Sequence, residues 1–335
     1  RGPHNLLANI YTAMPIPVTV EGANILTRTL MIFGQGVIRC HPYLYDEVRA
    51  LQQGDVVGFD RAFWHHLGTM SRNGFRMVGL SLSRGYLARS PVSGEIAPYY
   101  RKLAWASTTF AFLTDLALLG LGGTLKRREK LTGRFADLLS WMYLSMATLR
   151  RFEAEGQTAA DLPTVHWTMH YAFAQMQQAI EGILANLDLP IVGGLLRSVV
   201  WSGWRLNPIG TYPTDTLGSQ VAQQVQLPGE LRDRLTQGIY LPTHPDEALG
   251  RLEQAFRLST AATTSLKTVK TAIKAGQLPQ AALPHLLESA LSMGIITTDE
   301  AALLREAELA CREAVQVDAF TPEEYGGTIA TVKTF

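Results

Sequence analysis

Apolar residues recur every three or four positions along most of the chain, the spacing that places them on one face of an α-helix. Runs of alternating Val, Ile and Thr between turn residues, which would indicate strands, are nearly absent. The pattern therefore predicts an all-α fold of long helices. The clearest apolar stripe lies within residues 126–155 and consists of Leu131, Phe135, Leu138, Met142, Ser145, Leu149 and Phe152. For this stretch, a core helix of an antiparallel bundle is favoured over a dimerising coiled coil.

Capping residues indicate where several helices begin and end. Asp60 is expected to cap a helix that ends at about Ser83, and Asp161 with Pro163 is expected to open one that ends at about Asn186. Two Thr-x-x-Glu pairs have the spacing of capping boxes, and three glycines follow periodic runs, where a left-handed residue would end a helix: Thr297 with Glu300, Thr321 with Glu324, Gly54, Gly156 and Gly276.

One stretch, residues 203–229, breaks the helical pattern. It holds Pro208, Pro213 and Pro228 together with several glycines, which predicts a long irregular connection. Loops of that length are uncommon inside a compact domain. We therefore expect the connection to separate a larger helical unit from a smaller C-terminal unit that begins near His244.

Residues 103–125 form the only stretch that is long and apolar enough to be considered as a membrane span. Asp115 and three glycines lie within it, and basic residues stand on both sides, so it has no orientation bias. A buried core helix is favoured. A helix near anionic headgroups stays open as an alternative, because Lys126, Arg127 and Arg128 follow directly.

Composition narrows the class of protein. With 47% hydrophobic and 18% charged residues the chain is expected to fold, and a net charge of +1 gives no basic field that would steer it to nucleic acid. Cys40 and Cys311 are too few for a disulfide framework or a four-thiolate zinc site. A reducing compartment fits, so a cytoplasmic location is expected, with association with the inner membrane left open.

Several histidine and cysteine pairs lack a part that their chemistry needs. His166 and His170 have a spacing that can hold zinc on a helix, but no third ligand is apparent, so no metal is predicted. The adjacent His65 and His66 point to different faces of a helix. Cys40 and His41 are neighbours without an orienting acid, so a nucleophile–base pair is not expected. The glycines at residues 120–123 lack the ending of a phosphate loop and predict a turn between helices.

Residues 15–33 carry the strongest candidate chemistry. They are expected to form an extended, proline-bearing entry that turns at Glu21 and Gly22 into an amphipathic helix. Apolar neighbours would raise the pKa of the Glu21 carboxyl above its usual value of about 4.3, whereas the helix N-terminus would lower this pKa. A carboxylate between these effects suits a general base, and Gly22 would let a ligand approach the backbone. The alternative is an ordinary carboxylate at a helix start.

From residue 21 the chain reads Glu-Gly-Ala-Asn-Ile-Leu-Thr-Arg, which resembles the Glu-Gly-Thr-(Asn/Ser)-x-Ile-x-Arg signature near the end of acyl-CoA dehydrogenases. The likeness to the bacterial long-chain type extends to Gly2-Pro3-x-Asn5, to Thr19-Val20 before the signature, and to residues 31–36 and 38–42. Residues 110–130 and 317–324 are similar to the large helical C-terminal extension of this type. The resemblance covers essentially the whole chain.

The resemblance implies FAD-dependent α,β-dehydrogenation of a long-chain acyl-CoA to trans-2-enoyl-CoA, the first step of fatty-acid β-oxidation. Glu21 would be the catalytic base, and its backbone N–H would bind the thioester oxygen together with the ribityl chain of the flavin. Gly22, Ala23 and Asn24 would lie near the FAD. Ala23 replaces the usual Thr and lacks its hydroxyl group. Arg28 matches the signature and is assigned a structural role first.

The resemblance also implies a domain order and partners. Residues 1–50 would finish the catalytic C-terminal domain and residues 51–335 would form the helical extension, while the N-terminal helical domain, the β-domain and much of the FAD site would precede Arg1. Acyl-CoA would be the substrate, electron-transfer flavoprotein the electron acceptor, and the assembly a homodimer. Three roles for the extension stay open: covering the flavin site, dimerisation, and guidance to a membrane. The alternative is a non-catalytic helical module for oligomerisation or membrane association.

Overall fold

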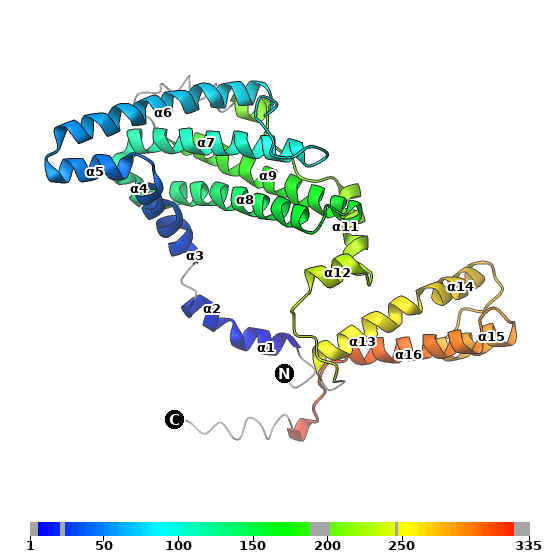
Figure 1. Ribbon diagram of the computed structural model, residues 1–335. Coiled ribbons are helices and arrows are strands. Elements are labelled where there is room, and N and C mark those ends of the chain that lie inside the picture. The colour runs from blue at the N-terminus through cyan, green and yellow to red at the C-terminus, as the bar shows by residue number, and fades with distance from the viewer. Residues whose placement is uncertain (1–5, 21–23, 188–201, 245–246, 325–335) are drawn as a thin grey trace. The chain divides into compact units, whose positions relative to one another are not determined.

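The computed structural model describes residues 6–20, 24–187, 202–244 and 247–324. Over these residues the chain is 77% helical and contains no strand, which confirms the all-α prediction (Figure 1). The chain divides into two compact units, one of residues 18–222 and one of residues 1–17 with 223–335. Residue 50, where the two parts of the predicted domain order meet, lies inside the larger unit and within helix α5 (Leu44–Gln53).

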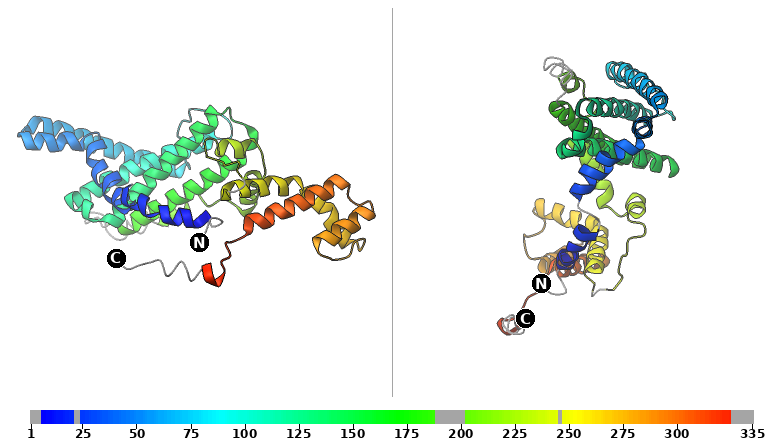
Figure 2. Two further views of the ribbon diagram at one scale, coloured as in Figure 1. Left: turned by 90° about the horizontal axis from the view of Figure 1, so that it is seen from below. Right: turned by 90° about the vertical axis from the view of Figure 1, so that its left-hand side faces the viewer.

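Four long helices lie lengthwise beside one another in the larger unit (Figures 1 and 2). They are α6 (Val56–Leu82), α7 (Ala97–Leu121), α8 (Glu129–Ala154) and α9 (Leu162–Asn186). Helix α7 packs against α6 and α8, and α8 packs against α9. The core between them is built from large side chains with no exposed surface, among them Trp105, Phe135, Leu149, Met169 and Ile180.

The segment before the bundle is helical as well. It runs through α2 (Pro15–Val20), α3 (Asn24–Leu26), the π-helix η1 (Thr27–Gln35) and α4 (Gly36–Cys40), and η1 packs against α8. The extended entry predicted from the prolines is therefore wrong. Pro15 and Pro17 lie in the first turn of α2, where a missing backbone N–H removes no helical hydrogen bond.

The predicted helix starts are partly corrected. Helix α6 begins one turn earlier than expected, because Asp55 and not Asp60 caps it: the Asp55 carboxylate accepts a hydrogen bond of 2.9 Å from the backbone N–H of Gly58. Helix α9 has the predicted bounds, with Pro163 in its first turn. The side chain of Asp161 makes no capping hydrogen bond, because its backbone is helical and continues the 3₁₀ turn η3 (Ala159–Asp161).

The apolar stripe and the remaining boundary signals are confirmed. Six of the seven stripe residues on α8 are buried and Met142 is partly buried, so the stripe serves the core of the bundle. Thr297 and Glu300 form a capping box, and Thr321 and Glu324 make the same reciprocal hydrogen bonds. Positive φ angles of 68°, 88° and 73° are found at Gly54, Gly156 and Gly276.

The stretch expected to be irregular contains a helix. Helix α11 (Asp215–Gln226) begins directly after Thr214, whose hydroxyl accepts a hydrogen bond from the backbone N–H of Leu217. The prolines lie before and after this helix and not within it, so they do not interrupt its hydrogen bonds. The irregular part of the stretch is therefore shorter than predicted. The short helix α12 (Glu230–Leu235) follows.

The smaller unit has a core of its own. Its helices are α1 (Leu6–Ala13), α12, α13 (Ala248–Ala261), α14 (Thr263–Lys274), α15 (Leu283–Ser292) and α16 (Thr298–Val315). Helix α16 packs against α13, α14 and α15, and buries Ala301 and Leu304 against Val269, Leu287 and Ala290.

The apolar stretch considered as a membrane span is a core helix in this fold. It forms most of α7, and twelve residues of α7 are buried, Asp115 among them. By length and composition alone, α7 with the 3₁₀ helix η2 (Gly122–Arg127) could cross a membrane, which is weak support for a span. The predicted turn after Gly120 is confirmed: Gly122 has a φ of 47°, and η2 leads directly into α8.

Candidate functional site

The predicted catalytic residues fall at the edge of what the structure describes. Glu21, Gly22 and Ala23 lie outside the described residues, and Asn24 is the first residue of α3. Arg28, the last residue of the signature, lies in the first turn of η1. The described part of the site is therefore the segment that follows Glu21 and the helices on which it rests.

Arg28 fastens this segment to α8. Its guanidinium makes a two-pronged ion pair with the carboxylate of Asp137, in which Nε and Nη2 each donate to one oxygen. The hydrogen bond to Asp137 raises the pKa of Arg28, so the cation is present at every relevant pH. A Cβ atom added at Gly133 would approach Nη1 of Arg28 to 2.9 Å. The absence of a side chain at Gly133 thus lets Arg28 lie flat on α8, in agreement with its expected structural role.

Two further contacts hold η1 on the bundle. The hydroxyl of Thr132 donates a hydrogen bond of 2.6 Å to the backbone carbonyl of Thr29. The ring of Phe33 stacks on that of Phe135 at a centroid distance of 4.3 Å and meets Phe110 edge-on at 5.9 Å. A π-helix leaves backbone groups out of the usual α-helical pairing, and the hydroxyl of Thr132 satisfies one of them.

A buried polar network begins at His41, the residue that follows α4. Asp115 on α7 accepts a hydrogen bond of 2.9 Å from Nε2 of His41, and Nε2 of His66 lies 3.5 Å from the same oxygen. Nδ1 of His66 lies 2.8 Å from the carboxylate of Glu47 on α5. All four side chains are less than a fifth exposed. The network therefore joins α5, α6 and α7 to the loop that follows α4.

The hydrogen bonds define which atoms carry protons in this network. Nδ1 of His41 accepts from the backbone N–H groups of Tyr43 and Leu44, so its proton lies on Nε2 and is donated to Asp115. Both ring nitrogens of His66 face carboxylate oxygens, so a proton on either nitrogen has an acceptor. The two rings lie 4.4 Å apart and share the Asp115 carboxylate as a neighbour.

Three side chains of this network are of the kinds that bind metal ions. His41, His66 and Asp115 offer three ligand atoms within 4.8 Å of one another. A histidine that binds a metal through Nε2 normally donates its Nδ1–H to an acceptor, as His66 could do to Glu47. His41 does the opposite, because its Nδ1 receives two backbone N–H groups. The donor set therefore fits a hydrogen-bonded network better than a metal centre.

An apolar cavity of about 290 Å³ opens beside this network. Its apolar lining comes mainly from η1, α4, α7 and α8, and the polar residues Thr69, Asn73, Thr114 and Asp115 line it as well. The apolar lining consists of Ile32, Phe33, Val37, Phe110, Ala111 and Leu139. The hydroxyl of Thr114 is buried and has no hydrogen-bond partner in the part of the chain described. The lining therefore suits an apolar group that also carries a polar atom.

The histidine pair on α9, His166 and His170, lies close to α7 and to the turn before it. His166 contacts the hydroxyl of Tyr99 at 2.7 Å and the carboxylate of Glu95 at 3.4 Å. Burial, followed by the charge of Glu95, raises the pKa of Tyr99 to about 12, so Tyr99 stays a neutral donor. Burial lowers the pKa of His170, and the nearby Lys102 and His166 lower it further.

Sequence reasoning missed the polar network although two of its members were considered. His41 was paired with Cys40, whose side chain is exposed, and His66 was paired with His65. The available signal was Asp115, a charge inside an apolar core helix, which requires a buried partner. The sequence alone does not say that the partners are His41 and His66, because they lie 74 and 49 positions away.

Comparison with protein families gives one match that covers more than four fifths of the chain. The family described as "Acyl-CoA dehydrogenase, C-terminal, bacterial type" matches residues 38–320, which include the polar network and the four-helix bundle and begin after the Glu21 segment. No solved structure matches the chain at a significant level. The chain belongs to the bacterial-type family of acyl-CoA dehydrogenase C-terminal domains, which are parts of oxidoreductases.

Proposed function

We propose that this chain supplies the catalytic base, Glu21, for the FAD-dependent α,β-dehydrogenation of long-chain acyl-CoA to trans-2-enoyl-CoA. The observation that carries the proposal is the attachment of the signature to the family domain. Arg28, seven residues after Glu21, is paired with Asp137 on α8, and α8 lies within the matched residues. The described end of the signature thus packs on a helix of the family domain.

The reaction separates a proton and a hydride from neighbouring carbons. Glu21 removes the proton from the carbon next to the thioester, and the hydrogen on the next carbon leaves with its electron pair, so that a double bond forms. The bound FAD supplies the acceptor for this hydride. A carboxylate suits the first step because the thioester stabilises the developing negative charge, and the backbone N–H of Glu21 would donate to the thioester oxygen.

Gly22, Ala23 and Asn24 are proposed as the residues of this chain that lie near FAD. Gly22 and Ala23 fit this position because neither has a side chain beyond Cβ, which leaves room for a flat ring system against the backbone. Ala23 contributes no hydroxyl donor, so a polar contact there would come from the backbone.

The preference for long acyl chains is supported by the apolar cavity. Its lining begins with Ile32, eleven positions after Glu21 on the same segment. An alkyl chain bound there would replace water against Phe33, Phe110 and Leu139, with a gain of roughly 0.8 kcal/mol for each buried methylene group. Shorter acyl chains would leave this surface unused.

The proposal includes the setting of the reaction. Dehydrogenation of long-chain acyl-CoA is the first step of fatty-acid β-oxidation, and electron-transfer flavoprotein is proposed as the acceptor that reoxidises the flavin. The proposed location is the cytoplasm, and association with the inner membrane is proposed as the alternative. In the cytoplasm the enzyme would meet both acyl-CoA and electron-transfer flavoprotein.

Replacing the proposed base tests the function directly. In the flavin-containing enzyme, Glu21→Gln should retain FAD and lose the bleaching of the flavin by a long-chain acyl-CoA, with a decrease in rate of about 10²–10⁴-fold. Glu306→Gln on α16 is the matched control, because Glu306 is exposed and far from Glu21 in the sequence. Unchanged bleaching in the Glu21 variant would show that another group is the base.

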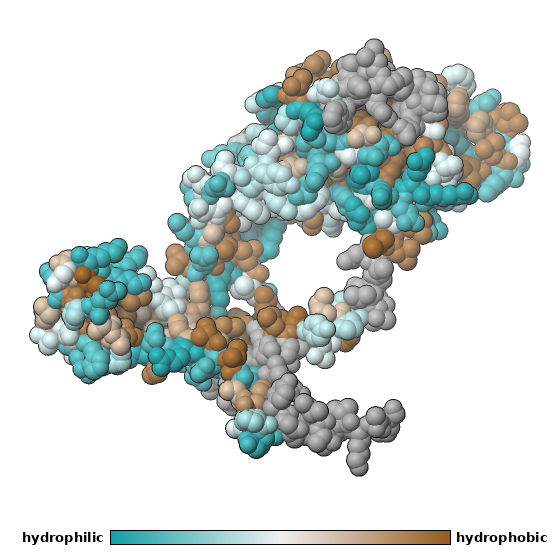
Figure 3. Space-filling view, turned by 180° about the vertical axis from the view of Figure 1, so that it is seen from behind, coloured by the Kyte–Doolittle hydropathy of each residue, from teal (hydrophilic) through white to brown (hydrophobic). Residues whose placement is uncertain are grey.

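A second candidate function is favoured by an exposed apolar stripe on α6. Val57, Trp64, Leu67, Phe75, Val78 and Leu82 lie on one face of this helix, and all are more than 40% exposed. Figure 3 shows apolar side chains grouped over the end of the larger unit where α5 meets α6. The stripe suits a homodimer interface, without catalysis by this chain.

The stripe can be tested through the mass of the protein in solution. Light scattering during size-exclusion chromatography should give a dimer, and Trp64→Ser with Phe75→Ser should give a monomer. A monomeric parent protein that floats with anionic liposomes would favour membrane association over the dimer.

A further inference from the structure

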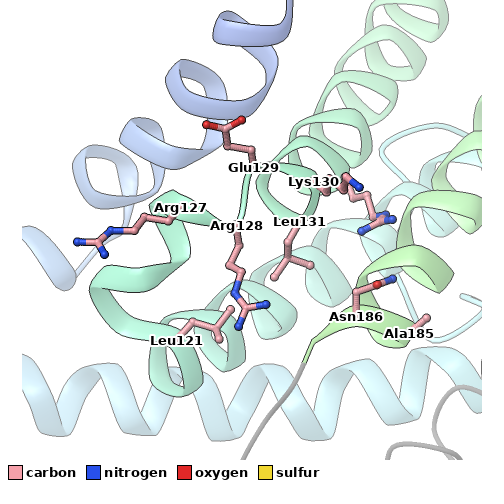
Figure 4. A pocket seen from close by; sticks show the side chains of 9 residues that line it. Leu121, Arg127, Arg128, Glu129, Lys130, Leu131, Ala185 and Asn186 are labelled. Atoms are coloured by element: carbon pink, nitrogen blue, oxygen red, sulfur yellow. The ribbon is translucent and has the colours of Figure 1, made fainter.

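A second cavity, of about 600 Å³, opens where α8 begins and α9 ends. Figure 4 shows most of its lining side chains. They come from the end of α7, η2, the first two turns of α8 and the last residues of α9: Leu121, Arg127, Arg128, Glu129, Lys130, Leu131, Arg134, Ala185 and Asn186. Its volume lies within the usual range for sites of small molecules and cofactors.

The lining is strongly basic. Four cations stand against one carboxylate, Glu129. Within the part of the chain that the structure describes, none of these four cations forms an ion pair. In Figure 4 Arg128 and Glu129 point in opposite directions, so the carboxylate does not neutralise Arg128. The cavity thus has an excess of positive charge, which its single carboxylate, Glu129, does not balance.

Packing holds one of these cations in place. Arg134 is half-buried and lies against Gly182 on α9, where an added Cβ atom would approach its Cδ to 2.8 Å. Less side-chain entropy is then lost when Arg134 binds an anion. Arg128 and Lys130 are exposed and can adjust to the ligand.

We propose that this cavity binds the phosphate groups of a soluble, nucleotide-like ligand. Arginine guanidinium groups bind phosphate oxygens through two parallel hydrogen bonds, and the start of α8 adds backbone N–H donors of the first helical turn. The apolar side chains of Leu121 and Leu131 and the amide of Asn186 would contact the less polar part of such a ligand.

The position of the apolar side chains argues for a soluble ligand and against a lipid surface. An amphipathic helix that lies on a membrane inserts exposed apolar side chains at the boundary between headgroups and acyl chains. In this cavity Leu131 is buried and Leu121 is half-buried, so neither reaches beyond the cations. The charge therefore lies in a hollow, where a small phosphate compound can enter.

This inference deepens the proposed function and rests on it for the identity of the ligand. Acyl-CoA carries a 3′-phosphate and a pyrophosphate at the end opposite to its thioester, and these groups have the chemistry that the cavity recognises. The coenzyme A part of the substrate would then bind at the start of α8, a helix of the family domain.

The test is calorimetric titration of the 335-residue chain with free coenzyme A, with pyrophosphate and with vesicles of phosphatidylglycerol. Coenzyme A is expected to bind, and pyrophosphate to compete with it. Arg128→Ala combined with Lys130→Ala should weaken binding by at least about tenfold, because two charge-assisted contacts are lost. Both residues are exposed, so the variant should fold, and circular dichroism will check this. Lys270→Ala combined with Lys274→Ala removes two exposed charges from the smaller unit and should leave binding unchanged.

Two results would overturn the inference. One is coenzyme A binding that is absent or equal in the parent and in the Arg128/Lys130 variant. The other is binding to the vesicles that the variant loses and that coenzyme A does not compete for, which would assign the cations to a lipid surface. Neither result depends on the dehydrogenase reaction, so a failure here is distinguishable from a failure of Glu21 as the base.

Discussion

At the scale of single residues, the structure explains how the described end of the signature is held on the helical bundle. Arg28 is fixed by the carboxylate of Asp137 and by the space above Gly133. Both lie on α8, more than one hundred positions away in the sequence. Asp137 and Gly133 therefore position Arg28, and under the proposed function we expect them to position the segment that begins at Glu21.

Removing the carboxylate of Asp137 should slow the reaction while the flavin stays bound. For Asp137→Asn in the flavin-containing enzyme we expect kcat to fall by about tenfold, because a misplaced base loses orientation, and KM to change little. Steady-state kinetics with a long-chain acyl-CoA give both values. Asp299→Asn, at an exposed position in the first turn of α16, is the control. A change in KM alone would show that Asp137 serves substrate binding instead.

The polar network of His41, His66, Asp115 and Glu47 is expected not to bind metal ions. Because Nδ1 of His41 accepts two backbone N–H groups, its Nε2 keeps a proton and is a poor ligand. Zinc or manganese ions should therefore leave the melting temperature of the chain unchanged, and a chelator should have no effect on it. A rise of several degrees with one ion, lost in His66→Gln, would contradict this assignment.

At the scale of elements, the capping residues decide where helices begin. Asp55 caps α6 through Gly58, whereas Asp60 lies in the second turn of the same helix. The sequence offered both residues, and the choice depended on Gly54, which ends α5 in the left-handed conformation and leaves Asp55 as the first residue that can cap. A glycine that ends one helix, followed directly by an aspartate, predicts that the aspartate caps the next helix, as Gly54 and Asp55 do.

Replacing the two aspartates should separate their roles. Asp55→Ala is expected to lower the free energy of unfolding by about 0.5–2 kcal/mol through the loss of the cap. Asp60→Ala should change it by less than about 0.5 kcal/mol, the usual effect at a surface position. Urea denaturation followed by circular dichroism measures both. Equal losses would mean that the cap of α6 is not the hydrogen bond to Gly58.

The capping box of α16 predicts a dependence of stability on pH. The pKa of Glu300 is lowered first by the backbone N–H of Thr297, and then by the hydroxyls of Ser265 and Thr297. A carboxylate with a lowered pKa stabilises the folded state above its ordinary pKa of about 4.3, and this contribution is lost as the pH falls through the lowered value. Melting temperatures of the smaller unit should therefore fall between pH 5 and pH 3, by less in Glu300→Gln than in the control Glu306→Gln. Parallel curves for the two variants would refute this origin.

At the scale of the whole molecule, the fold class could be predicted and the long-range contacts could not. The period of the apolar residues gives α8 and α9 because it depends only on neighbours three and four positions away. The partners of Arg28 and Asp115 depend on how helices far apart in the sequence pack, and no local pattern encodes this. The number of prolines in residues 203–229 predicts an irregular stretch, whereas their positions leave residues 215–226 free of proline. The helix that begins at Asp215 lies in this gap.

Each compact unit has its own core, which predicts separate effects of core mutations. Asp115→Ala leaves Nε2 of His41 and Nε2 of His66 without their shared acceptor, and should destabilise the larger unit by about 1–3 kcal/mol. The smaller unit, with its core around Leu287 and Ala301, should be unaffected. Calorimetry should show one transition moving to lower temperature and one unchanged. A single transition that moves as a whole would show that the two units unfold together.

The central claim is that Glu21 takes a proton from the carbon next to the thioester. The most direct measurement is the loss of deuterium to water from a long-chain acyl-CoA labelled at that carbon, followed by mass spectrometry on the flavin-containing enzyme. We predict that the parent enzyme releases the label, and that Glu21→Gln retains it while it still binds FAD and substrate. Release of the label at the same rate by both proteins would contradict the claim.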